Sequence, residues 1–244
     1  MQALSTSELL SIWEWGLARS AVRLVLMLLA SAYPECEPES LARLSVGQRD
    51  SLLFTLRESV FGQRMISLVK CPVCGEELEF DFISSDICMR YEESRQEMQY
   101  ISDSGFDVQF RLPNSLDLAA IDRIEDLAVA EKLLLSYCLR SSKKDGEEIP
   151  VDQLPDEIVD AIAEQMARSD PSGDIQMAIV CASCGHEWMQ IFDIVSFFRH
   201  EIDTWARRVL LEVHLLASAY GWKEADILAM SPNRRQIYLE MSCV

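Results

Sequence analysis

Two distant stretches of the chain, KCPVCGEELEF at 70–80 and VCASCGHEWMQIF at 180–192, carry the same short motif. Each contains Cys-x-x-Cys-Gly between two runs of alternating apolar and polar residues. When the cysteines are aligned, Phe82 of the first stretch matches Phe192 of the second. The alternation predicts a strand on each side of the cysteines. The glycine after the second cysteine suits a tight turn with positive φ. Each stretch is therefore predicted to form a zinc-knuckle hairpin.

The two hairpins together supply a full set of metal ligands. Two thiolates cannot complete a tetrahedral site, but four can. We therefore predict one structural Zn²⁺ held by Cys71, Cys74, Cys181 and Cys184. Such a site is closed, because no coordination position remains for water or substrate.

Three other interpretations of the cysteines remain open. The thiols could be reduced and free of metal, they could form disulfides, or His186 could replace one cysteine as a ligand. A redox Cys-x-x-Cys motif would begin a helix, whereas an alternating strand follows both pairs here.

The rest of the chain is predicted to be helical around this unit. The fold class is α+β and mostly α-helical, with a central small zinc-ribbon-like β unit made of the two hairpins. We divide the 244 residues into an N-terminal helical region (1–64), a first hairpin (65–83), an inserted strand and helical region (84–174), a second hairpin (175–195) and a C-terminal helical region (196–244).

The N-terminal region contains a clear helix start. Ser5 and Glu8 have the spacing of a capping box, which predicts a helix beginning near Ser7. Its apolar stripe continues to Leu29, and Pro34 ends the segment.

The C-terminal region contains the longest helical pattern. Its apolar residues recur at spacings of three and four, as one face of a long helix requires: Trp205, Val209, Val213, Leu216 and Tyr220. By contrast, the charged segment SSKKDGEEIP at 141–150 is predicted to be a solvated loop.

The charge balance limits the classes of partner. The chain has 40 acidic and 22 basic residues and a formal net charge of −18, so it should repel nucleic acid and anionic lipid. Its longest strongly apolar run, 24–33, is much shorter than the roughly 20 residues of a membrane span. The first residues lack the basic region of a signal peptide. We expect a cytoplasmic protein with no nucleic-acid partner and no membrane span. A zinc-ribbon regulator that binds nucleic acid is kept as an alternative.

No pattern in the sequence predicts catalysis. The chain has three histidines, and none belongs to a zincin motif; a phosphate-binding glycine loop and a nucleophile elbow are also missing. We expect a protein that is not an enzyme and that acts by binding other proteins. Aromatic and arginine residues dominate interface energetics; the alternative for each aromatic residue is packing in the core. The candidate partner-binding residues are Trp13, Trp15, Trp222, Arg234, Arg235 and Tyr238.

Several phrases together resemble a known family. They are IWEWGLARSAVRLVLMLLA at 12–30, LSVGQRDSLLFTLRESVFG at 44–62, FRLPNSLDLAAI at 110–121, the two cysteine stretches, and WARRVLLEVHLLASAYGWKEADILAMSPNRRQIYLEM at 205–241. In these phrases the chain is similar to the baseplate hub assembly chaperone family of T-even-type contractile phages and of phage-tail-like contractile injection systems.

The resemblance implies a role in building a contractile particle. The partners would be baseplate or hub proteins, and no catalytic residue is implied. The protein could leave the finished particle or remain in the virion, or virion-like particle, as a structural baseplate subunit.

Overall fold

The structure is a computed structural model that describes residues 1–87 and 98–242. The fold is α+β and mostly helical, as predicted. Contacts within the chain divide it into two compact units. Unit 1 comprises Met1–Glu35 and Val195–Val244, and unit 2 comprises Cys36–Ile194. Residues 36–64 of the predicted N-terminal region thus fall in unit 2, while the boundaries of the five predicted regions remain a prediction.

Unit 1 consists of helices in the part that the structure describes. They come from both ends of the chain: α1 (Thr6–Gly16), α2 (Ala21–Ala32), α9 (Ile194–Tyr220), α10 (Glu224–Leu228) and α11 (Pro232–Ser242). No described helix combines the length and the apolar character that crossing a membrane requires.

The first helical segment is broken in two, although its apolar stripe reads as one. The capping box at Ser5 and Glu8 is present and starts α1 as predicted. After Gly16 the chain turns and α2 packs against α1. A Cβ on Gly16 would lie 2.6 Å from Leu24 Cδ1, so the missing side chain permits this close approach. Ser20 then begins α2 as its N-cap.

Helix α9 carries the core of unit 1. Ala206 and Val209 are buried against Leu10 of α1. Further along, Val213 and Leu216 are buried with residues of α10 and α11. The predicted apolar stripe of a long C-terminal helix is thus confirmed.

Unit 2 contains every strand that the structure describes. Its helices are α3 (Pro38–Arg43), α4 (Val46–Phe61), α5 (Ser84–Ile87), α6 (Ser115–Ile121), α7 (Leu127–Cys138) and α8 (Asp156–Ser169), with short 3₁₀ turns η1 (Val151–Gln153) and η2 (Pro171–Gly173). Its strands are β1 (Arg64–Lys70), β2 (Glu77–Ile83), β3 (Gln99–Asp103), β4 (Phe106–Phe110), β5 (Leu139–Lys144), β6 (Glu147–Glu148), β7 (Gln176–Val180) and β8 (Glu187–Ile191).

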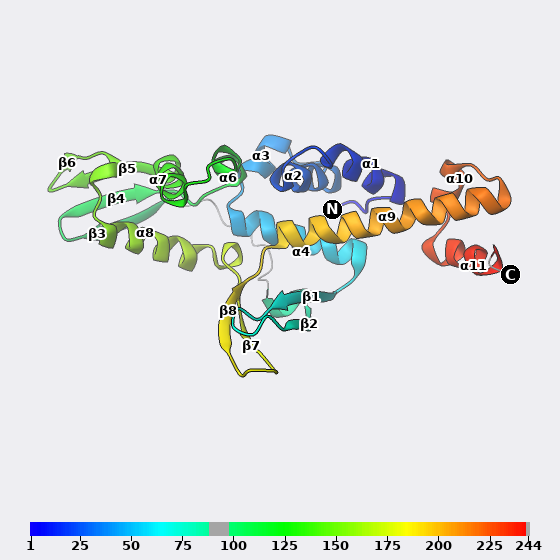
Figure 1. Cartoon of the computed structure of the whole chain (residues 1–244). Coiled ribbons are helices and arrows are strands. Elements are labelled where there is room, and N and C mark those ends of the chain that lie inside the picture. Colours follow the sequence, from blue (N-terminus) through cyan, green and yellow to red (C-terminus); the bar gives the residue numbers. More distant parts are fainter. Residues whose placement is uncertain (88–97, 243–244) are drawn as a thin grey trace. The chain divides into compact units, whose positions relative to one another are not determined.

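A four-stranded antiparallel sheet of order β3-β4-β5-β6 and helix α8 form one layer pair (Figure 1). Phe106, Val108 and Phe110 alternate along β4 and face Ile158 and Ile162 of α8 in one buried cluster. Phe110 and Ile162 are almost fully buried, so this cluster is the core of the inserted region.

The prediction of a solvated loop at 141–150 is wrong. The segment forms strands β5 and β6, which pair Lys143 with Glu148 and Lys144 with Glu147. Asp145 and Gly146 have φ of +51° and +90°, which is the signature of a tight Asp-Gly hairpin turn. Opposite charges lie across the strands and stabilise the pairing, so a charged composition here supports a hairpin.

Helix α4 connects both halves of the cysteine repeat. Its C-terminus leads into β1 through Gly62, whose φ is +85°. At its N-terminus the Gly47 N–H donates to Asp170 Oδ2 at 2.8 Å, and Asp170 lies just before β7. A Cβ on Gly47 would collide with Asp170. The segments that lead into β1 and β7 therefore both contact helix α4.

Candidate metal centre

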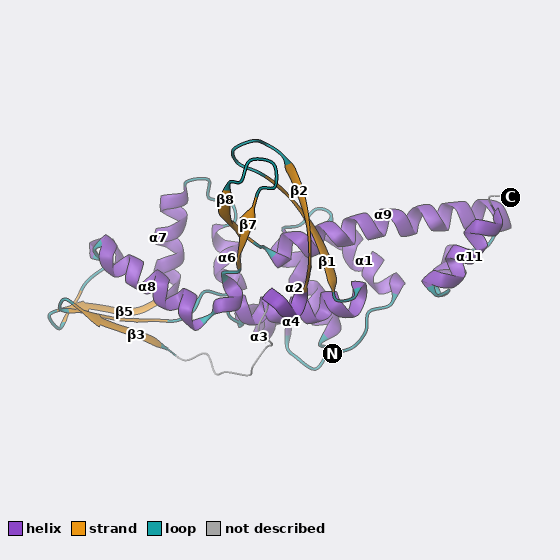
Figure 2. Ribbon diagram, turned by 90° about the horizontal axis from the view of Figure 1, so that it is seen from below, coloured by secondary structure: helices purple, strands orange, loops and turns teal. Residues whose placement is uncertain are grey.

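The two cysteine stretches fold into hairpins of the same design, seen in Figure 2 as β1–β2 and β7–β8. In the first, Cys71 donates its N–H to the Glu76 carbonyl and Gly75 donates to the Cys71 carbonyl. The second repeats both bonds at Cys181 and Gly185. The two glycines have nearly equal φ, +74° and +73°, so both turns use the conformation that favours glycine.

The four predicted ligands come together. Their sulfur atoms all lie within 4.8 Å of one another. Cys71 Sγ is 3.7 Å from Cys184 Sγ, and Cys74 Sγ is 3.6 Å from Cys181 Sγ. A regular tetrahedron with metal–sulfur bonds of about 2.3 Å has edges of about 3.8 Å. The observed separations therefore fit four sulfurs around one metal ion, and they are too long for disulfide bonds.

The burial of the ligands follows the design of the turn. Cys71 and Cys181, at the ends of β1 and β7, are buried, while Cys74 and Cys184 are exposed. The space between the four sulfurs is therefore covered on the side of the strand ends and open to solvent at the hairpin turns.

The thiols influence one another's ionisation. The backbone N–H of Cys74 donates to Cys71 and lowers the pKa of that thiol to about 6. The N–H of Glu76 lowers the pKa of Cys74, but the hydrogen bond with Cys184, burial and the remaining thiols outweigh it and raise that pKa to about 12. The set therefore opposes full ionisation until a cation neutralises the charge, which is what a bound divalent metal does.

His186 lies outside the group of ligands among the described residues. Its ring stacks on Trp188 with centroids 5.8 Å apart. The geometry therefore favours four sulfur ligands over a set in which His186 replaces one. A closed set of this kind holds a metal for structure and offers no open position for chemistry.

The aromatic candidates for partner binding lie in unit 1 and are half-buried. The Trp13 indole N–H donates to Asp203 Oδ1 at 3.0 Å. Trp15 lies beneath Arg19, whose Cζ is 4.0 Å from the ring centroid. Trp222 meets Tyr238 edge-on at 4.8 Å. All of these contacts are intramolecular, so partner binding by these residues stays a prediction.

The two arginine candidates differ sharply. Arg234 is exposed, with its Cζ 5.7 Å from the Tyr238 ring centroid. Arg235 is 2% exposed and pairs with Glu212 of α9 at 2.9 Å, so it fixes α11 onto α9. Of the six candidates it is the least available to a partner.

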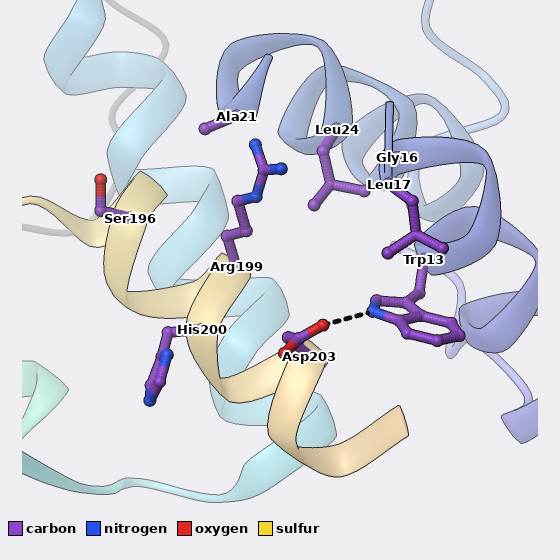
Figure 3. A pocket seen from close by; sticks show the side chains of 9 residues that line it. All are labelled: Trp13, Gly16, Leu17, Ala21, Leu24, Ser196, Arg199, His200 and Asp203. Carbon is purple, nitrogen blue, oxygen red and sulfur yellow. Dashed lines mark hydrogen bonds between the residues drawn. The ribbon is translucent and has the colours of Figure 1, made fainter. Parts of the chain in front are cut away.

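Unit 1 also contains a cavity of about 460 Å³ that sequence reasoning missed (Figure 3). Helices α1 and α2 supply an apolar wall and α9 a polar one; the lining residues are Trp13, Gly16, Leu17, Ala21, Leu24, Ser196, Arg199, His200 and Asp203. Hydrogen bonds from Arg207 and Trp13 lower the pKa of Asp203, so it stays a carboxylate engaged within the protein. The wall combines residues more than 170 positions apart, and no local motif could have indicated it.

The family model described as T4 bacteriophage base plate protein matches residues 21–199, well over half of the chain. No curated protein and no solved structure matches the chain.

Proposed function

The chain belongs to the family described as T4 bacteriophage base plate protein, and from this we propose that it is a non-catalytic assembly factor for the baseplate hub of a contractile phage tail or phage-tail-like injection system. The family match carries the proposal. It spans α2 to α8 and both hairpins, so the candidate metal centre lies within the matched part of the chain.

We propose further that the bound metal is Zn²⁺ and that its role is structural. Four sulfur donors in tetrahedral arrangement suit zinc, and a closed site leaves no position for a substrate. The hairpins have few large buried side chains of their own, with Met65 and Phe192 the main ones. A shared metal therefore supplies cohesion that their small core does not.

The proposed lack of catalysis rests on how the polar groups are used. In the cavity of unit 1, Asp203 is engaged by Trp13 and Arg207. Arg199 donates to the carbonyl of Arg19. These bonds hold helices together, and they give the groups a structural part in the described chain.

An assembly factor and a retained subunit are distinguished by where the protein ends up. Particles assembled in the producing cells would be purified and the protein quantified in them, with sheath and tube proteins as internal standards. An assembly factor is present in hub intermediates and absent from finished particles, and deletion of its gene stops baseplate formation. If finished particles hold the protein in a fixed ratio to the hub, the assembly-factor proposal is wrong.

The second candidate is a structural baseplate subunit. The description of the matched family favours it, because it names a base plate protein and no assembly role. The same quantification decides between the two. In the subunit case, deletion of the gene yields particles that lack one defined component or no particles at all.

The zinc proposal has its own test. Metal analysis of the purified protein is expected to give one zinc per chain. Substoichiometric metal after purification without chelators, or iron in place of zinc, would contradict it.

A further inference from the structure

The two hairpins can be compared position by position on the exposed faces of their strands. Aligned on the cysteines, Glu79 and Asp81 of β2 correspond to Met189 and Ile191 of β8. All four side chains are exposed. None of these residues is a candidate metal ligand, so metal binding does not explain why the first hairpin has acidic residues where the second has apolar ones.

The exposed face of the first hairpin carries two ion pairs. Arg64 pairs with Asp81 at 2.6 Å and Lys70 pairs with Glu77 at 3.2 Å. Lys70 and Glu77 are direct partners in the register of β1 and β2, whereas Arg64 reaches Asp81 diagonally, because Asp81 pairs with Ile66. This face also exposes Ile66, Leu68 and Ile83, but the ion pairs place charged groups beside these apolar side chains.

The outer face of the second hairpin has no such pairs among the described residues. Val180, Met189 and Ile191 are 59%, 57% and 65% exposed. Ala178 pairs directly with Met189 in the register, so the apolar side chains are contiguous across the two strands. Only Gln176 and Glu187 interrupt them. We call these four apolar residues the β7–β8 face.

The β7–β8 face lies in a strongly acidic unit. Unit 2 has 31 acidic and 14 basic residues, a balance of 14 − 31 = −17, and unit 1 has 9 and 8, a balance of −1. The two sum to the −18 of the whole chain. Glu187 lies on the face itself and Asp174 precedes β7. A partner for this face is favoured if it brings lysine or arginine beside its apolar residues.

A second copy of the chain is a poor occupant. Two copies would bring two units of −17 together. In addition, a face two strands wide and five residues long covers only about 160 Å², against about 800 Å² per partner in a stable interface. Such a face suits one segment of a larger heterologous contact.

The spacing of the face suggests the conformation of that segment. Alternate residues of a strand recur about every 7 Å, and an extended segment presents its own alternate side chains at the same interval. We infer that the β7–β8 face docks an extended, apolar segment of another protein that is flanked by lysine or arginine residues. This inference rests on the proposed function, which makes the partner a component of the baseplate.

The test uses the full-length protein and the baseplate proteins encoded beside its gene, each purified separately. Dissociation constants are measured for the wild type and for two variants of the second hairpin. Met189→Gln/Ile191→Thr removes the apolar surface and should weaken binding at least tenfold. Glu187→Lys reverses the rim charge and should weaken binding at low salt, with the difference shrinking at high salt because the charges are screened.

The first hairpin supplies the matched control. Ile66→Gln/Leu68→Ala writes the residues of the second hairpin onto the corresponding positions of the first and should leave the dissociation constant within twofold. Zinc content and circular dichroism establish that all variants fold.

Each outcome is decisive. Unchanged binding by Met189→Gln/Ile191→Thr overturns the inference and leaves the proposed function standing, as does an equal loss in the control. Wild-type self-association that this variant abolishes would identify a second copy as the occupant and overturn it too. If the wild type binds none of these proteins, the proposed function fails and the inference fails with it.

Discussion

The two hairpins are one design used twice, and the places where they differ show which forces act on each. Around the four cysteines they agree in strand register, turn hydrogen bonds and glycine conformation. At their bases they differ. Phe192 is buried, stacks on Phe54 of α4 at 6.0 Å and meets Phe82 edge-on at 5.4 Å. Phe82, its counterpart in the first hairpin, is only half-buried. The hairpins are alike where their four cysteines converge, and contact with helix α4 accounts for the difference at their bases.

The largest expected effect tests whether the hairpins are equal halves of one site. Cys74→Ser and Cys184→Ser each remove an exposed sulfur at the same position of the repeat. Because three thiolates leave a tetrahedral site open, both variants should fall from one zinc per chain to nearly none after dialysis against a weak chelator. Plasma emission spectrometry measures this. Retention of zinc by only one of the variants would show that the halves are unequal.

The bases of the hairpins should respond unequally. Phe192→Ala opens a cavity against α4 and should cost about 3–4 kcal/mol of stability. Phe82→Ala removes a half-buried ring and should cost about 1–2 kcal/mol. Chemical unfolding with zinc present compares them. Equal losses would mean that α4 supports both hairpins alike.

The two turn glycines should respond equally. A Cβ on Gly75 or Gly185 meets no atom within 4 Å, so Gly75→Ala and Gly185→Ala differ from the wild type only through the positive φ. That conformation costs a residue with a side chain about 1–2 kcal/mol. The free energies of unfolding of the two variants are compared by thermal melting. A difference of more than about 1 kcal/mol between them would reveal a contact that only one of the turns makes.

The smallest effect concerns the ion pairs of the first hairpin. Arg64→Ala and Lys70→Ala break exposed pairs. Exposed pairs contribute little and are screened by salt, so the melting temperature should fall by less than about 2 °C. If the melting temperature falls further and the fall persists in 1 M salt, Arg64 and Lys70 stabilise the hairpin by more than their ion pairs. The ion pairs would then not account for the difference between the two hairpins.

The sequence predicted well whatever depends on local chemistry. The cysteine spacing and trailing glycines predicted that the four cysteines come together, as they do, and the capping box at Ser5 placed a helix start. These features need only a few neighbouring residues, so a single sequence reveals them.

The failures have physical causes of two kinds. The Asp145-Gly146 turn carried its own hairpin signal, but the charged residues around it suggested a loop because their cross-strand partners were not recognised. The break after Gly16 depends on the approach of Leu24, and the burial of Arg235 depends on Glu212 of another helix. Such contacts are set by tertiary packing, which periodicity does not report.

The proposed metal centre would also impose an order on synthesis. Cys71 and Cys74 leave the ribosome roughly 110 residues before Cys181 and Cys184, which at typical elongation rates is about 5–20 s. During that interval the nascent chain displays half a site, exposed to oxidants and to competing ions, while the inserted sheet and helices are still being made. The centre can therefore close only late in translation, after all residues between the two hairpins have left the ribosome.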